Sequence, residues 1–198
     1  MSPEEYVGYE NLIRFIEDRQ LQLLEGDIIE IGAYMGGGTV KLARFAKKYQ
    51  KRVFAVDTFD PEVDRTVGRG GVTAGEVYRA FLEGPSMFEI YEKAIAGLDN
   101  VVTLRVDSRR LAFPREQKFF FGFIDGCHQR SYVENDFAVV WTQLVSGGAV
   151  GFHDYHFDDW PEVTPAVDGI VAEYTREIAE TVEIKGKGDV STLLLVKR

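Results

Sequence analysis

The fold is decided by the stretch EIGAYMGGGT, residues 30–39. It continues the apolar run Ile28–Ile31 through a glycine-rich turn into a segment with helical periodicity. Open α/β sheets bind ligands at the carboxyl ends of their strands, where the strand order reverses. Glycines in such a turn let the backbone approach a ligand closely. We therefore predict a ligand site at the end of this first strand.

Short apolar runs recur along the chain, and segments with helical periodicity separate most of them. The first five runs are near-continuous rather than alternating, which is typical of parallel strands buried on both faces. Strands that alternate with helices predict a doubly wound α/β sheet. The expected strands are residues 28–31, 53–56, 101–106, 119–124, 149–152, 182–184 and 192–196.

The last two runs are joined by KGKGD, residues 185–189, which is too short for a crossover helix. They are expected to form an antiparallel hairpin. The expected fold is thus a Rossmann-like, seven-stranded, mostly parallel sheet that ends in a hairpin, in one domain over residues 1–198. A helix capped by Ser2 is expected to run to about Gln20, within an N-terminal segment 1–25. A further helical face is expected from Val163 to Ile178.

A helical and loop insert is expected over residues 58–100, between the second and third strands. Its first part, residues 58–73, contains three glycines and no clear periodicity. Long loops in compact domains are usually functional or mobile. The sequence leaves open the role of this loop, the role of the N-terminal helix and the oligomeric state, a homodimer included.

Composition limits the partners and the compartment. The 198 residues carry a net charge of −9 and a single cysteine. An acidic surface repels phosphate backbones, so nucleic acid is not expected as a partner. The N-terminus lacks the features of a signal peptide, and no apolar run approaches the ~20 residues of a membrane span. We expect a cytoplasmic protein that acts on a small molecule.

The glycine pattern departs from the dinucleotide fingerprint G-x-G-x-x-G. Tyr34 occupies the place of the second glycine, where backbone must approach a pyrophosphate. Glu30 suits a ligand with an amino group and a sulfonium better than one with phosphates. Asp57, at the end of the second strand, can accept both hydroxyls of a ribose. That interaction would serve NAD and S-adenosylmethionine equally.

The third strand is followed by Asp107 and Ser108. In a ligand that contains an adenine, Asp107 could accept from the adenine amino group. Asp and Ser are also good helix N-caps, and both interpretations stay open.

All three histidines of the chain lie just after the fourth and fifth strands, in IDGCH, residues 124–128, and HDYH, residues 153–156. Asp125 and Asp154 are an oxygen-ligand pair suited to a divalent cation such as Mg²⁺. A bound cation would lower the pKa of an acceptor hydroxyl. His128 has the chemistry of a general base near neutral pH. If the bound ligand is S-adenosylmethionine, the oxygen formed would attack its sulfonium methyl in line.

The motif ExGxxxGGGT, then IDGxHxxxYVxxD over residues 124–136 and LxxGGxxxxHDY over residues 144–155, resembles class I S-adenosylmethionine-dependent methyltransferases of the macrocin O-methyltransferase type. The resemblance covers residues 26–196. It implies methyl transfer to a small hydroxylated molecule, a sugar or a phenol, with His128 and Asp125 catalytic. The donor-site candidates are Glu30, Gly32, Ala33, Tyr34, Gly38, Thr39, Asp57, Thr58, Asp107, Ser108 and Asp125.

The resemblance also implies metal ligation by Asp125 and Asp154. The family expects an acidic residue where this chain has His153. Imidazole ligates metals, but Mg²⁺ prefers oxygen, so the third ligand and the identity of the cation stay open. Two other functions stay open as well: an NAD(P)-binding oxidoreductase on a related fold, and a donor-binding subunit without catalysis. The acceptor is not identified by the sequence.

Overall fold

The structure, a computed structural model, describes residues 8–82, 84–186 and 190–198. Within them, seven strands form one sheet in the order β3-β2-β1-β4-β5-β7-β6. Strands β1 to β5 are parallel, and β7 runs antiparallel to both β5 and β6. The bounds are β1 Asp27–Ile31, β2 Val53–Asp57, β3 Val101–Arg105, β4 Phe119–Ile124, β5 Leu144–Tyr155, β6 Ile178–Lys185 and β7 Ser191–Lys197.

This topology confirms the predicted mostly parallel Rossmann-like sheet with its terminal antiparallel pair. The strand order reverses between β1 and β4, so the carboxyl end of β1 is the switch point at which such sheets bind ligands. Residues 187–189 of the expected hairpin connection lie outside the described residues.

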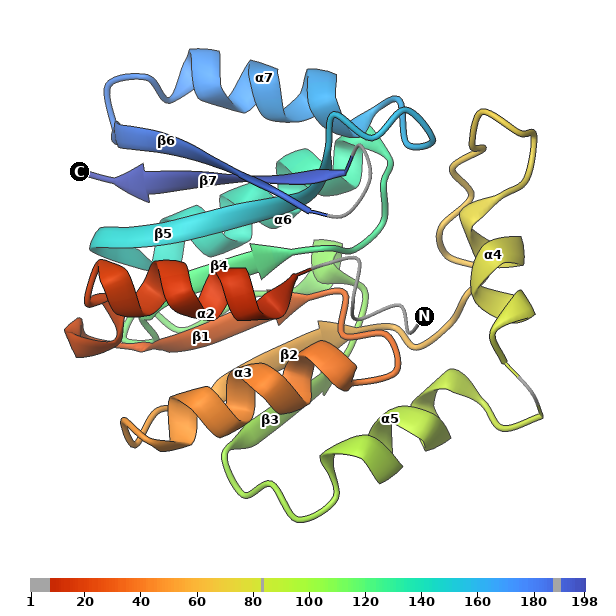
Figure 1. The fold of residues 1–198 in the computed structure, drawn as a ribbon, viewed down its shortest axis with the longest axis horizontal. Coiled ribbons are helices and arrows are strands. Elements are labelled where there is room, and N and C mark those ends of the chain that lie inside the picture. The colour runs from red at the N-terminus through yellow and green to blue at the C-terminus, as the bar shows by residue number, and fades with distance from the viewer. Residues whose placement is uncertain (1–7, 83, 187–189) are drawn as a thin grey trace.

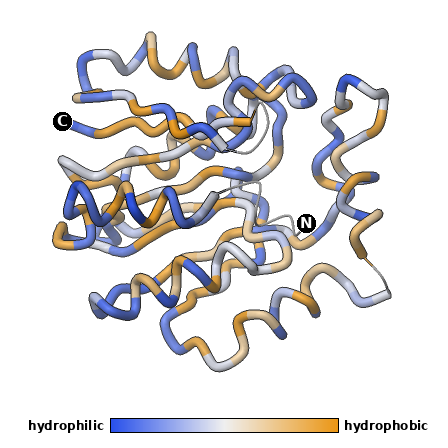
Figure 2. The backbone as a smooth tube through the Cα atoms, viewed as in Figure 1, coloured by the Kyte–Doolittle hydropathy of each residue, from blue (hydrophilic) through white to orange (hydrophobic). Residues whose placement is uncertain are grey.

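Helices cover both faces of the sheet (Figure 1). Helices α2 and α3 pack on one face, and α6 and α7 pack on the other, each over its own cluster of buried side chains. Figure 2 shows the matching pattern, with hydrophobic residues concentrated along the strands and both kinds of residue on the helices. The bounds are α2 Tyr9–Asp18, α3 Gly37–Lys47, α6 Arg130–Gln143 and α7 Val163–Glu173, with short 3-10 turns η1 Leu21–Leu23 and η2 Ser108–Arg110.

Two helices form the insert between β2 and β3. They are α4, Ala74–Ala80, and α5, Met87–Ile95, and each begins with a capping box, at Thr73 and at Ser86. In Figure 1, α4 stands across from the carboxyl ends of the parallel strands. The insert therefore faces the edge of the sheet where the ligand site is expected. None of the helices in the described ranges is long and apolar enough to cross a membrane.

Two helix predictions were wrong in their bounds. The N-terminal helix does not run unbroken to Gln20, because Gly8 has a φ of +68° and α2 begins only after it; the proposed cap at Ser2 lies outside the described residues. The helical face predicted to reach Ile178 ends at Glu173. The amide of Ile178 donates to the carbonyl of Tyr174, 3.0 Å away. This single turn after α7 places Ile178 at helical spacing from the apolar residues of α7. Ile178 is nevertheless the first residue of β6.

Candidate active site

A cavity of about 440 Å³ opens at the carboxyl ends of β1, β2, β4 and β5. Its volume lies in the range of small-molecule sites, which is roughly 300–1,000 Å³. The glycine-rich turn after β1 forms one end of its wall, and the residues that follow β4 and β5 form the other. Residues of the insert, Asp60 to Phe81, complete the wall. The two motifs that the sequence analysis singled out therefore share one cavity.

Most of the donor-site candidates line this cavity. Asp57 is fixed by backbone amides, because its carboxylate accepts from the N–H of Tyr34 at 2.8 Å and from that of Phe59 at 2.6 Å. Burial raises its pKa despite these hydrogen bonds. Tyr34 adopts a left-handed conformation with φ of +49°, which turns its amide toward that carboxylate. The candidates on the wall are Gly32, Ala33, Tyr34, Gly38, Asp57, Thr58, Ser108 and Asp125.

The glycines of the turn serve close contacts within the protein. A Cβ atom at Gly32 would overlap the carbonyl of Asp125, and Gly32 has a φ of +95°. A Cβ atom at Gly38 would overlap the ring of Tyr9. Glycine at these positions thus lets the start of α2 and the end of β4 close around the turn.

Glu30 lies behind the cavity wall. Its side chain is fully buried, and its carboxylate accepts from the hydroxyls of Tyr9, at 2.9 Å, and Thr39. Burial raises the pKa of Glu30 to about 7, against the opposing effect of these two hydrogen bonds. Tyr9 itself lines the cavity. Glu30 and Thr39 can therefore act on a donor through Tyr9, and Glu30 also through its charge, rather than by direct contact.

The residues after β3 divide between two roles. Asp107 caps η2 by accepting from the amide of Arg109, and its carboxylate also accepts from the guanidinium of that residue at 2.7 Å. The Arg109 hydrogen bond lowers the pKa of Asp107 to about 2. Ser108 lies on the cavity wall, whereas the cavity-lining residues do not include Asp107. The N-cap interpretation of Asp107 is thus what the geometry shows, and an adenine contact stays a prediction.

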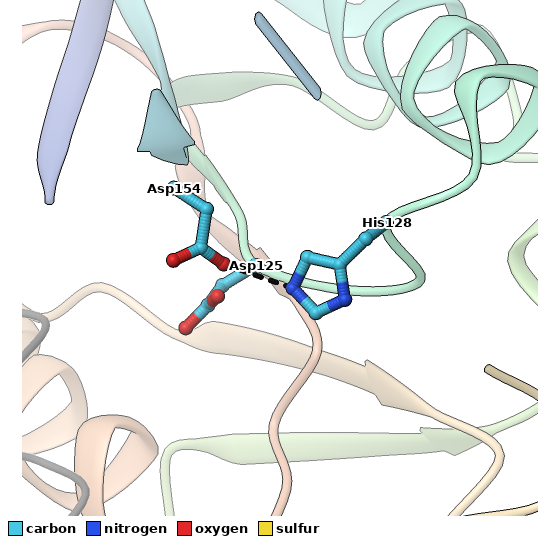
Figure 3. A group of neighbouring side chains, drawn as sticks. All are labelled: Asp125, His128 and Asp154. Atoms are coloured by element: carbon cyan, nitrogen blue, oxygen red, sulfur yellow. Dashed lines mark hydrogen bonds and ion pairs between the residues drawn. The ribbon is translucent and has the colours of Figure 1, made fainter. Parts of the chain in front are cut away.

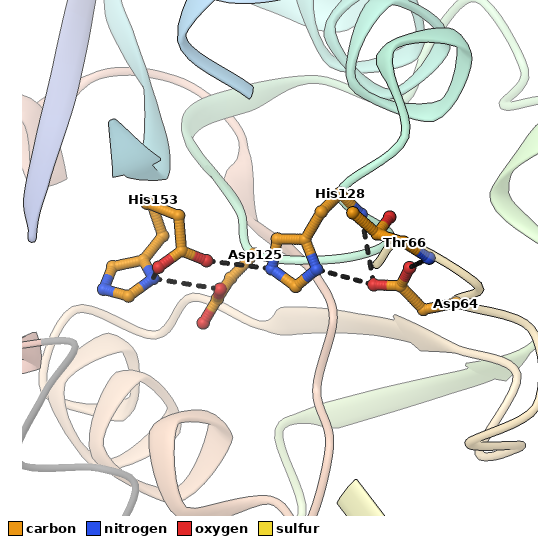
Figure 4. Close-up of polar contacts among 6 residues, drawn as sticks. Asp64, Thr66, Asp125, His128 and His153 are labelled. Atoms are coloured by element: carbon orange, nitrogen blue, oxygen red, sulfur yellow. Dashed lines mark hydrogen bonds and ion pairs between the residues drawn. The ribbon is translucent and has the colours of Figure 1, made fainter. Parts of the chain in front are cut away.

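His128 is held between two carboxylates that come from different segments (Figure 4). Its Nδ1 lies 2.6 Å from Oδ2 of Asp64, and its Nε2 lies 2.8 Å from Oδ2 of Asp154. The ring also stacks on Trp160, with centroids 4.5 Å apart. Burial alone would lower the pKa of His128, but the two carboxylates outweigh it and raise the pKa to about 10. In this arrangement the ring is the doubly protonated, positively charged imidazolium at neutral pH.

Asp125, His128 and Asp154 offer ligand atoms that all lie within 4.8 Å of one another (Figure 3). His153 adds a fourth group, because its Nδ1 lies 3.2 Å from Oδ1 of Asp125 and 3.0 Å from Oδ1 of Asp154. These contacts are close enough for charge attraction, but the buried nitrogen makes no aligned hydrogen bond. His153 thus presents a buried nitrogen without a hydrogen bond beside the carboxylates of Asp125 and Asp154. This arrangement is compatible with the prediction that these three residues bind a cation.

Sequence reasoning missed Asp64 and Tyr78, both from the insert. Asp64 is buried, and its carboxylate accepts from the amide of Thr66 as well as meeting His128. Tyr78 lines the cavity, and burial together with the nearby Asp64 raises its pKa well above the usual value. The aperiodic sequence of residues 58–73 indicated a functional or mobile loop and left its role open, and no spacing in the sequence links its aspartates to His128.

The sequence profile of a family described as "Methyltransferase domain" matches residues 29–155, from β1 to the end of β5. The chain belongs to this methyltransferase family. The matched region contains the glycine-rich turn and the Asp125–His128 and His153–Asp154 segments. The family assignment confirms the predicted methyltransferase and removes the oxidoreductase alternative.

Solved methyltransferases share the fold of this methyltransferase. The O-methyltransferase NovP superposes with a TM-score of 0.69 at 19% identity, over 96% of this chain and 79% of that one. The O-methyltransferase TomG from Streptomyces achromogenes, solved with SAM, gives 0.64 at 17% identity, over 99% and 83%. An rRNA methylase from Streptococcus thermophilus gives 0.60 at 13% identity, over 93% and 95%. Since the neighbours include both O-methyltransferases and an rRNA methylase, the shared fold does not identify the acceptor.

One curated relative is protein R132 of Acanthamoeba polyphaga mimivirus, which is 46% identical over 52 residues. The match covers 26% of this chain and 24% of that protein. The chain therefore matches about a quarter of the length of this relative.

Proposed function

We propose that this protein is an S-adenosylmethionine-dependent O-methyltransferase that acts on a small hydroxylated acceptor. The observation that carries the proposal is the single cavity that joins Asp57 and Tyr34 to Asp125, His128 and Asp154. Methyl transfer needs the donor and a proton-accepting group at one place, aligned with the acceptor oxygen. The likeness to NovP and TomG, both O-methyltransferases, supports oxygen as the acceptor atom.

The donor would lie along the turn after β1. Asp57 would accept from the ribose hydroxyls, since its carboxylate is held at the cavity wall by two amides. Ser108, on the wall after β3, would lie toward the adenine. The methionine end would lie near Gly32 and Tyr9, with the charge of Glu30 behind them favouring the amino group and the sulfonium.

The reacting groups would lie at the ends of β4 and β5. The acceptor oxygen attacks the donor methyl, the bond from methyl carbon to sulfur breaks, and S-adenosylhomocysteine leaves. The hydroxyl proton passes to His128. The ring is a doubly protonated imidazolium in the resting arrangement, and contacts with the histidines lower the pKa values of Asp64 and Asp154. The imidazolium must therefore release a proton to solvent before its nitrogen can accept the proton of the acceptor hydroxyl.

A divalent cation would be held by Asp125, Asp154 and His153, since the Nδ1 atom of His153 lies 3.2 Å from Oδ1 of Asp125 and 3.0 Å from Oδ1 of Asp154. When bound, such a cation would acidify an acceptor hydroxyl. Two carboxylates with an imidazole suit Mn²⁺ or another cation that accepts nitrogen better than Mg²⁺, which prefers oxygen.

Calorimetric titration with S-adenosylhomocysteine tests the donor site, with NAD as the parallel ligand. We expect micromolar binding of S-adenosylhomocysteine and none of NAD. Asp57→Ala should lose that binding, whereas His128→Ala should keep it and lose methyl transfer. Equal activity of His128→Ala and the parent enzyme would remove His128 from the mechanism. Tight binding of NAD with no binding of S-adenosylhomocysteine would refute the proposal as a whole.

A further inference from the structure

The charge of the cavity wall limits which acceptors can enter. Six aspartates line the cavity. No lysine or arginine is found among its lining residues in the described part of the chain. The lining aspartates are Asp57, Asp60, Asp64, Asp125, Asp136 and Asp154.

Two nearby arginines do not offset these aspartates, because each of the two is paired with an acid of its own. The guanidinium of Arg79, on α4, pairs with Glu62. Arg109 pairs with Asp107 and lies over the ring of Tyr132. Anionic groups such as phosphates and carboxylates are bound in proteins by arginine, lysine or exposed amides. The imidazoles of His128 and His153 also lie on the wall, but each is already paired with two of its aspartates. The described wall therefore offers no unpaired cationic side chain to an anionic acceptor.

Apart from Asp60 and Asp64, the side chains that the insert and Trp160 contribute to the cavity wall are largely apolar. The side chains there are Val63, Val77, Tyr78, Phe81 and Trp160. Phe81 is 54% exposed, which is unusual for a phenylalanine and places an apolar ring at the rim of the cavity. A sugar ring against this wall would lose water from several hydroxyls and gain few partners, and each unpaired hydroxyl is costly. A flat aromatic ring loses little by the same contact and gains stacking.

We propose, on the basis of the proposed O-methyltransferase function, that the acceptor is a phenol or catechol that is uncharged or carries an amine, and that phosphorylated or carboxylate-bearing acceptors are excluded. The aromatic ring lies against Tyr78 and Trp160. Its reacting hydroxyl faces Asp125 and His128. An amine on the acceptor would be attracted by the aspartates at the mouth of the cavity, of which Asp60 is the exposed one.

Binding of a matched set of probes tests this assignment, each titrated into the protein saturated with S-adenosylhomocysteine. The probes are 4-(2-aminoethyl)catechol, its N-acetyl form, 3,4-dihydroxyphenylacetate, methyl glucoside and UDP-glucose. We expect the amine and the N-acetyl form to bind, the carboxylate to bind at least about tenfold more weakly, and neither sugar to bind. Methyl transfer with S-adenosylmethionine should follow the same order.

Three results would overturn the assignment: a carboxylate that binds as well as the amine, a sugar that binds better than the catechols, or a protein that binds S-adenosylhomocysteine but none of the catechols. Failure to bind S-adenosylhomocysteine would instead refute the proposed function, so the two failures are distinguishable.

A charge-reversal variant isolates the electrostatic part of the proposal. Asp60→Lys places a cation at the mouth without touching the groups after β4 and β5, and it should narrow the ratio of amine to carboxylate affinity by about tenfold. Glu92→Lys changes the net charge equally from an exposed site on α5 outside the cavity wall, so it should leave the ratio unchanged. An equal effect of both variants would show that the cavity charge does not select the acceptor.

Discussion

The Nδ1 atom of His128 lies 2.6 Å from Oδ2 of Asp64, although 64 residues separate the two along the chain. The same carboxylate oxygen also accepts from the backbone N–H of His128 at 3.2 Å. Asp64 belongs to the insert, whereas His128 follows a strand of the sheet. The insert is therefore tied to the reacting end of the site through the histidine itself.

Asp64 acts as a positioning residue, and Asp64→Asn should show this. The amide can still occupy the place but cannot hold the imidazolium as a carboxylate does, so we expect kcat to fall about tenfold to a hundredfold, as for other partners that orient a functional histidine. Affinity for S-adenosylhomocysteine should stay unchanged. The matched control is Asp159→Asn, which removes the charge of an exposed aspartate outside the cavity wall. Parallel losses in kcat and in donor affinity would indicate a merely structural role for Asp64.

Glu30 should make the protein less stable as the pH rises from about 4.5 to 7. Burial raises its pKa in the folded state to about 7, so between these values the folded protein binds a proton that the unfolded chain has released. Unfolding releases that proton and becomes easier as the pH rises, by roughly 3 kcal/mol across the window. Urea unfolding at a series of pH values measures the effect.

Glu30→Gln is the control for that pH dependence, because it removes the titrating group and keeps a side chain that can bond to Thr39 and Tyr9. Asp136, with a pKa raised to about 6, adds a similar slope in both proteins, so the difference between the two profiles isolates Glu30. Two parallel profiles would mean that Glu30 keeps its ordinary pKa in the folded protein.

The sheet and the convergence of its motifs could be predicted because they follow from local pattern. Buried parallel strands have near-continuous apolar runs, and the carboxyl ends of neighbouring strands must meet at one edge. Thus Asp125, His128 and Asp154 could be brought together from the sequence. Asp64 could not, since its contact with His128 depends on the path of an aperiodic loop.

The burial of Glu30 could not be predicted either, but the reason differs from that for Asp64. Its position before Gly32 predicted a direct donor contact, but α2 packs over α3 and places Tyr9 between Glu30 and the cavity. That packing joins residues 21 positions apart, and amphipathic spacing in α2 shows only that one face is buried. It does not say what that face covers.

A cation that accepts nitrogen should stabilise the folded protein. Mn²⁺ binding to Asp125, Asp154 and His153 would raise the melting temperature by an amount that grows with the Mn²⁺ concentration relative to its Kd. At the same concentration Mg²⁺ should have a smaller effect. Asp154→Asn should abolish the Mn²⁺ shift, whereas Asp168→Asn, a carboxylate bonded to Tyr155 away from the cluster, should retain it. Retention of the shift in Asp154→Asn would place the cation elsewhere. Chelator treatment should lower methyl transfer, and Mn²⁺ should restore it.

Two glycine-to-alanine substitutions in helices should have opposite effects on stability. Gly38 lies in α3 with the ring of Tyr9 in the place of its missing Cβ, and that ring is buried and hydrogen-bonded to Glu30, so it cannot move away freely. Gly38→Ala should therefore destabilise the protein by about 1–3 kcal/mol and weaken binding of S-adenosylhomocysteine, because Tyr9 also lines the cavity.

Gly169 lies in α7 with no atom within 4 Å of a Cβ placed there. Gly169→Ala should stabilise the protein by up to about 1 kcal/mol through helix propensity alone. Denaturant unfolding measures both. A stabilising Gly38→Ala would show that Tyr9 is not packed against the turn, and the close approach of α2 to the donor site would have to be abandoned.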